Sequence, residues 1–141
     1  MRKTGTLFIM LILCAAVRLT AQDCPGQQAY TPDRGTQERK AVLDALREEV
    51  YGMHGIRVVF VVRYMKVCDG WAWVHTQPRS ADGKEQYEDI LALIGRSGDD
   101  WQVLEIPCVE EENPDCINSE NYFEGLKKRF PGLPANILPA W

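Results

Sequence analysis

The first run of apolar residues after the N-terminal region follows the spacing of a helix. Residues 36–51 carry charged side chains between apolar ones, so that one side of the predicted helix is apolar. Thr36 is placed to cap the start, and Gly52 and Gly55 favour an end there. The positions at helical spacing are Val42, Leu43, Leu46, Val50 and Met53.

A second helix is predicted near the C-terminus, over residues 119–129. Ser119 is the predicted cap, and Pro131 follows the end of the helix. Three basic residues, 127–129, occupy the last turn, where they favour the helix dipole. The apolar face of this helix is formed by Tyr122, Phe123 and Leu126.

Between the two helices the pattern favours β-strands. Apolar, β-branched and aromatic residues are concentrated in four segments, 56–67, 71–76, 87–96 and 101–106. Periodicity alone leaves 87–96 open between helix and strand. We take it as a strand because Ser97–Asp100 has the composition of a hairpin loop.

The connections set the predicted fold. Asp69-Gly70 indicates a tight hairpin turn, whereas 77–86 is polar and indicates a longer loop. Val58–Val62 is apolar on both faces, so we expect this strand to be central or to be covered on both sides. Short connections predict an antiparallel four-stranded meander. The helices are expected to cover one of its faces, giving a two-layer α+β domain.

The first 21 residues have the pattern of a secretory signal peptide. Arg2 and Lys3 precede an apolar run of 11 residues, Leu7–Val17, and Ala21 ends a small-residue cleavage site. The run is shorter than the roughly 20 residues that span a bilayer. An uncleaved anchor and a lipoprotein lipidated on Cys14 are the alternatives.

Cleavage after Ala21 divides the chain into a signal peptide (1–21), an irregular lead-in (22–35) and one domain (36–141). The product is expected in the periplasm or outside the cell, with no transmembrane anchor. Cleavage removes three of 16 basic side chains and none of 20 acidic ones, so the formal charge falls from −4 to −7. A negative surface opposes binding to nucleic acid, which depends on Lys and Arg.

Four cysteines remain after cleavage, and an even number in an exported chain favours two disulfides. Three pairings are possible. The meander places Cys24 and Cys68 at one end of the sheet and Cys108 and Cys116 at the other. We therefore predict the pairs Cys24–Cys68 and Cys108–Cys116, because a disulfide needs a Cα separation of about 4.4–6.8 Å.

The tryptophans are the candidate binding residues. Trp71, Trp73 and His75 share one face of a strand by its two-residue period. With Trp101 they are predicted to bind a small ligand or a protein partner, since Trp is enriched in binding surfaces. The alternative is that these aromatic side chains are core.

A hydrolase-type enzyme is the alternative function. His75 would act as the general base, with Glu88 or Asp89 to orient it. The nucleophile would be Ser80 or Thr76. No catalytic or nucleotide-binding motif supports this, so we favour a non-enzymatic domain without a cofactor.

No metal site is predicted. His54 and His75 are the two histidines, and no cysteines are spaced as in a zinc site. Residues 110–115 are rich in oxygen ligands for calcium, but their spacing matches no calcium-binding loop. We expect a solvated acidic loop held by the disulfide.

Several core and turn segments carry a resemblance. They are Arg39–Arg47, the Val-rich strand, Gly70–Val74, Ala92–Ile94 and Trp101–Val103. Together they resemble an uncharacterised group of small exported bacterial proteins. The order of elements is also similar to cystatin-like and NTF2-like folds, in which a curved sheet wraps a helix. Some proteins of that shape bind small molecules. The similarity concerns the fold and does not imply an activity.

Overall fold

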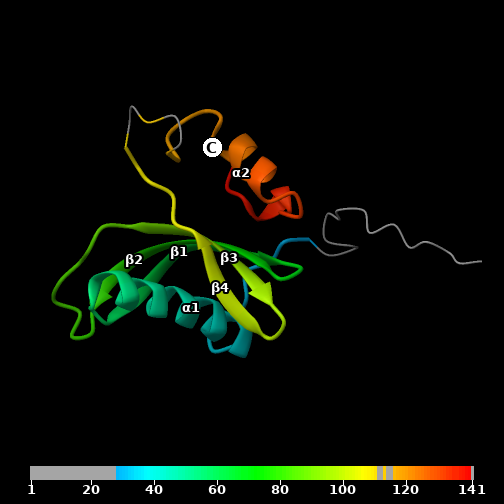
Figure 1. Cartoon of the computed structure of the whole chain (residues 1–141). Coiled ribbons are helices and arrows are strands. Elements are labelled where there is room, and N and C mark those ends of the chain that lie inside the picture. Colours follow the sequence, from blue (N-terminus) through cyan, green and yellow to red (C-terminus); the bar gives the residue numbers. More distant parts are fainter. Residues whose placement is uncertain (1–27, 111–112, 114–115, 141) are drawn as a thin grey trace, which may run out of the picture.

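The computed structural model describes residues 28–110, 113 and 116–140, and the predicted signal peptide and Cys24 lie outside these residues. A helix, four strands and a second helix follow in chain order (Figure 1). They are α1 (Gln37–His54), β1 (Val58–Cys68), β2 (Trp71–Ser80), β3 (Ile90–Ser97), β4 (Asp100–Glu105), α2 (Tyr122–Arg129) and the 3-10 helix η1 (Ala135–Ile137).

The strands lie in the order β1-β2-β3-β4, and every neighbouring pair is antiparallel. The predicted α+β meander is confirmed. None of the helices in the described ranges has both the length and the apolar content needed to span a membrane.

The ends of α1 follow from local chemistry. The Thr36 side chain accepts a hydrogen bond from the backbone N–H of Arg39, which confirms the predicted cap. Gly55 adopts a left-handed φ of 68°, and its N–H donates to Tyr51 O at 2.8 Å. Gly52 stays helical, so α1 extends three residues beyond the predicted end.

The turn between β1 and β2 is the predicted tight turn. Asp69 and Gly70 have φ values of 46° and 77°, and two successive left-handed residues match the right-handed twist of a hairpin. The following strand is longer than predicted, because β2 continues to Ser80. Pro78 is tolerated there since β3 begins only at Ile90, opposite Thr76, and the proline lies beyond the regular ladder on that side.

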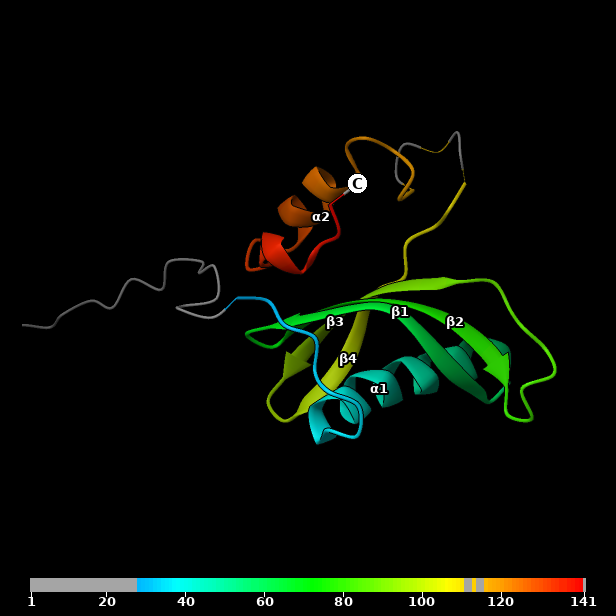
Figure 2. The same ribbon diagram turned by 180° about the vertical axis from the view of Figure 1, so that it is seen from behind.

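The two helices lie on opposite faces of the sheet, so the predicted two-layer arrangement is wrong. Figure 1 and Figure 2, seen from opposite sides, both show α1 on one side and α2 on the other. The reason is in the central strands, where consecutive residues of β3, Leu91–Ile94, are all buried. A strand that is apolar on both faces needs cover on both.

Each face has its own core. Against α1 the sheet contributes Val58, Met65, Val67, Ala72, Val74, Ala92 and Ile94. On the opposite face Cys68, Trp73, Leu91 and Leu93 pack with Tyr122, Leu126, Leu133 and Ile137 of the C-terminal segment.

Strand β1 is at the edge of the sheet, so the expectation that it is central or covered on both faces is wrong. Phe60 and Val62 pack toward α1. Val59 points to the other face and is 45% exposed. The C-terminal segment therefore leaves part of its face of the sheet open beside β1 and β2.

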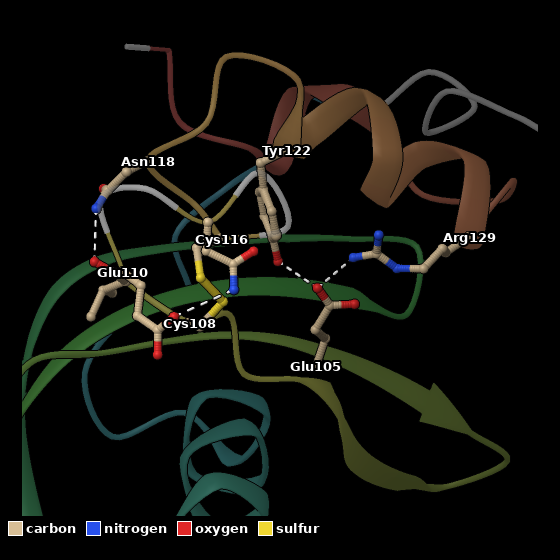
Figure 3. The surroundings of a disulfide bond; sticks show 9 residues. Glu105, Cys108, Glu110, Cys116, Asn118, Tyr122 and Arg129 are labelled. Atoms are coloured by element: carbon tan, nitrogen blue, oxygen red, sulfur yellow. Dashed lines mark hydrogen bonds and ion pairs between the residues drawn. A yellow bond between two sulfur atoms is a disulfide. The ribbon is translucent and has the colours of Figure 1, made fainter.

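The C-terminal segment is joined to β4 and to the residues that follow it at two places (Figure 3). Cys108 and Cys116 form a disulfide, as predicted, with a Cα separation of 4.7 Å. Glu105 Oε1 accepts hydrogen bonds from the Tyr122 hydroxyl at 2.6 Å and from Arg129 at 2.5 Å.

Of the second predicted disulfide, the structure describes one cysteine, Cys68. Cys68 takes part in a disulfide and is buried. Its predicted partner, Cys24, lies outside the described residues, so that pairing stays a prediction.

The start of α2 differs from the prediction. The helix begins at Tyr122 after Asn121, whose side chain makes no capping hydrogen bond. Ser119 lies in a turn, where its carbonyl accepts from the Tyr122 N–H at 3.2 Å. The apolar residues Tyr122 and Leu126 set the register of the helix, because both are buried against the sheet.

Candidate functional site

Trp71 and Trp73 lie on the sheet face that the C-terminal segment covers. Trp73 is fully buried, and its ring packs edge-to-face on Phe123 at 5.6 Å. Trp71 packs in the same manner on Phe130 at 6.0 Å. The predicted common face is therefore present, but its tryptophans are largely enclosed by the chain itself.

The fourth predicted residue, Trp101, lies elsewhere. It pairs with Arg96 across β3 and β4 and packs at the edge of the α1 core. The Arg96 guanidinium lies over its ring at 5.9 Å. The structure thus separates Trp101 from Trp71, Trp73 and His75 by the thickness of the sheet.

His75 is the member of the set that reaches open space. Its Nε2 lies 2.7 Å from Asp89 Oδ2, and its side chain is 30% exposed. An ionised carboxylate only accepts, so this contact favours the tautomer with Nε2–H and leaves Nδ1 as an acceptor. Of the two acidic partners considered from the sequence, the structure brings Asp89 to His75.

The predicted nucleophiles are not beside His75. Thr76 points to the opposite face, is fully buried and bonds to Ile90 O at 3.5 Å. Ser80 is the last residue of β2, and its hydroxyl donates to Asp82 at 2.6 Å. Within the described ranges, the side chain that hydrogen-bonds His75 is Asp89.

A pocket of about 540 Å³ opens beside His75, on the face opposite α1. That volume lies in the range of about 300–1,000 Å³ typical of small-molecule sites. We call it the His75 pocket. It is lined by His75, Leu91, Val109, Ile117, Asn118, Ser119, Glu120 and Phe123.

The floor of the His75 pocket comes from the sheet, because His75 and Leu91 are register partners on β2 and β3. One side is supplied by Phe123, at the start of α2. Phe123 is held by edge-to-face contacts with Trp73 and with its neighbour Tyr122. The buried tryptophan thus acts on the pocket indirectly, by positioning an aromatic side chain that lines it.

The remaining side of the pocket is built around the disulfide. Val109 follows Cys108, and Ile117 follows Cys116. The Ile117 N–H donates to Cys108 O at 3.0 Å. The Asn118 amide donates to Val109 O at 2.9 Å, so the two chains that leave the disulfide are paired (Figure 3).

The Tyr122 hydroxyl helps to hold the start of α2 against β4, through its hydrogen bond to Glu105. Two causes raise the pKa of Tyr122 well above its ordinary value. Burial is the larger cause, and the hydrogen bond to Glu105 is the second. The residue therefore remains a neutral hydrogen-bond donor over the physiological pH range.

Sequence reasoning missed most of the pocket. Leu91 was expected only as a strand residue, and the segment around Val109 and Ile117 only as an acidic loop. No motif marks these residues. The one available signal was the predicted Cys108–Cys116 pair, which implies that the residues following each cysteine lie close together.

The histidines and acidic residues form no metal site in the described part of the chain. His54 is the last residue of α1. Residues 111, 112, 114 and 115 of the candidate calcium loop lie outside the described residues.

No protein-family model, curated protein or solved structure matches this chain. The resemblance to small exported bacterial proteins and to cystatin-like or NTF2-like folds therefore stays a prediction.

Proposed function

We propose that this chain is an exported, non-enzymatic domain that binds a small, largely apolar ligand in the His75 pocket, on the Trp-bearing face of its sheet. One observation carries the proposal. A pocket of about 540 Å³ is formed by three separate segments of the chain, namely the sheet, the disulfide-linked chains and the start of α2.

The chemistry of the lining suggests the ligand class. Leu91, Val109, Ile117 and Phe123 are apolar and suit a hydrocarbon or aromatic body. His75 supplies a polar group at the edge of the pocket, and its Nδ1 suits a hydroxyl or N–H donor of the ligand. We therefore expect a ligand with an apolar body and one or few hydrogen-bonding groups.

Two features support export. The first 21 residues have the charge, apolar run and small residues of a signal peptide. The Cys108–Cys116 disulfide suits an oxidising compartment such as the periplasm or the cell exterior.

The second candidate is a hydrolase-type enzyme, favoured by the 2.7 Å contact between His75 and Asp89 beside a pocket. Such an enzyme needs a nucleophile within hydrogen-bond reach of the base. Ser119 is the hydroxyl residue among those that line the pocket, and it comes from a different segment than either predicted nucleophile. No hydrogen bond joins it to His75 within the described residues. The binding function is therefore better supported.

The binding test uses 1-octanol, a neutral probe with an apolar chain and one hydroxyl. Backbone amide NMR signals of the oxidised protein are followed during titration. We expect saturable shifts for residues that line the pocket, such as Leu91 and Ile117. Val109→Asp places a charge in the lining and is expected to weaken binding at least tenfold. Met53→Asp, at an exposed apolar residue of α1 outside the lining, is the matched control.

Shifts that do not saturate, or that Val109→Asp and Met53→Asp change equally, would contradict binding in this pocket. Hydrolysis of 4-nitrophenyl acetate tests the alternative in parallel. Turnover that is lost in both His75→Asn and Ser119→Ala would replace the binding proposal with the hydrolase.

A further inference from the structure

Beyond the His75 pocket, two arginines on neighbouring strands converge on one buried oxygen. Arg63 lies at the irregularity in β1, and Arg79 lies near the end of β2. Gln77 is 7% exposed, and its Oε1 accepts from Arg63 Nη2 at 3.0 Å and from Arg79 Nη2 at 3.4 Å. Two positive groups are therefore held close together.

No carboxylate in the described part of the chain lies within 4.0 Å of either guanidinium. The acid in this hydrogen-bond network is Asp89, which bonds to Gln77 and to neither guanidinium. Its Oδ1 accepts from Gln77 Nε2 at 3.2 Å, and its Oδ2 contacts His75. Asp89 therefore holds Gln77 and His75 in place and leaves the two arginines without a paired anion.

Arg79 also has an unsatisfied donor. Its Nε is buried, and no described group accepts its proton. A guanidinium carries five N–H groups, and each of these two arginines uses one of them on Gln77. A buried N–H without an acceptor costs free energy, which an added acceptor would recover.

We propose that Arg63 and Arg79, braced by Gln77, form a binding site for a single carboxylate or phosphate group. A guanidinium presents its N–H groups in a planar fork that matches both anions. An anion between the two would relieve their mutual repulsion and use their remaining donors. Val59 lies opposite Arg79 on the same face and is exposed, so it offers an apolar contact to the remainder of the ligand.

The charge of the whole chain limits the ligand to a small one. Acidic residues exceed basic ones by four, and a polyanion such as nucleic acid would meet net repulsion outside the pair. This proposal stands on the arginine pair and does not depend on ligand binding in the His75 pocket.

The test follows the arginine Nε–Hε NMR signals of the oxidised protein during titration with sodium phosphate, at ionic strength held constant with sodium chloride. We expect the Arg63 and Arg79 signals to shift with saturation. Arg63→Gln and Arg79→Gln are each expected to weaken phosphate binding at least tenfold. Arg47→Gln is the matched control, because that guanidinium lies on α1, on the other face of the sheet, and pairs with Asp44 at 2.6 Å.

Titrations with acetate and octanoate identify the source of the anion. Tighter binding of octanoate than of acetate would show that the site takes the head group of an apolar ligand, and equal binding would show that it takes free small anions. Either result supports the proposal if Arg63→Gln and Arg79→Gln abolish binding of the anion. Signals that drift linearly with each salt, or that shift no more than that of Arg47 in the wild-type protein, would overturn it.

Discussion

The side-chain amide of Asn118 donates to the carbonyl of Val109 at 2.9 Å. This bond joins the two chains that leave the Cys108–Cys116 disulfide, and the Ile117 N–H strengthens the pairing by donating to Cys108 O at 3.0 Å. Val109, Ile117 and Asn118 all line the His75 pocket. The disulfide therefore sets the shape of one side of the proposed binding site.

Removal of this disulfide is expected to affect binding as well as stability. The variant Cys108→Ser/Cys116→Ser should lose about 2–3 kcal/mol of unfolding free energy, because the unfolded chain is no longer constrained over the short loop. Affinity for 1-octanol should fall at least tenfold at a temperature where the variant is still folded. Urea denaturation and the NMR titration measure the two effects. Unchanged affinity would show that the disulfide does not shape the pocket.

Trp73 and Trp101 are expected to differ sharply when truncated. Trp73 is fully buried beneath Phe123, and Trp73→Ala should cost about 3–5 kcal/mol of unfolding free energy. Trp101 is only partly buried at the margin of the other core, so Trp101→Ala should cost less. Urea denaturation of both variants provides the comparison. Equal losses would argue against the assignment of Trp73 to the interior and Trp101 to a margin.

The buried Tyr122 hydroxyl predicts a loss of stability in alkali. Burial and the bond to Glu105 raise its pKa in the folded protein above the value of about 10 in the unfolded chain. Below about pH 10 both states hold the proton, and the full contribution to stability is present. As the pH rises further, the unfolded chain ionises first and the unfolding free energy falls.

Tyr122→Phe removes this titration while it keeps the ring. The variant should be less stable near pH 7, because the bond to Glu105 is lost. Its unfolding free energy should then fall less steeply than that of the wild-type protein between about pH 9 and pH 11. Parallel curves for the two proteins, from urea denaturation at each pH, would refute the prediction.

Export is tested by the mass of the protein recovered from the periplasm or medium of a bacterium that expresses the whole chain. Cleavage after Ala21 should leave a chain that begins at Gln22. Two disulfides should lower its mass by four hydrogens relative to the reduced form. Recovery in the cytoplasm with residues 1–21 attached would contradict the export proposal.

The sequence predicted local features of the fold well. The Thr36 cap, the Asp69-Gly70 turn and the Cys108–Cys116 pair depend on a few neighbouring residues or on strand order, and each is present in the structure. The number of layers depends on both faces of β3. Four consecutive buried residues of β3, Leu91–Ile94, need cover on both faces, and the strand predicted over 87–96 does not include this requirement.

In the candidate site, too, local features are predicted by the sequence and contacts between distant segments are not. The shared face of Trp73 and His75 follows from strand periodicity, and Asp89 is one of the two acidic partners, with Glu88, that are expected for His75. The pocket itself arises where α2 and the disulfide-linked chains meet the sheet. Contacts between segments as distant as Leu91 and Ile117 have no local pattern that would reveal them.

Intermolecular NOEs between 1-octanol and the oxidised protein test binding in the His75 pocket most directly. The proposal predicts NOEs from the octyl chain to the methyl groups of Leu91, Val109 and Ile117 and to the ring of Phe123, all of which line the pocket. NOEs confined to side chains of the α1 face, or none at ligand concentrations that saturate the amide shifts, would contradict it.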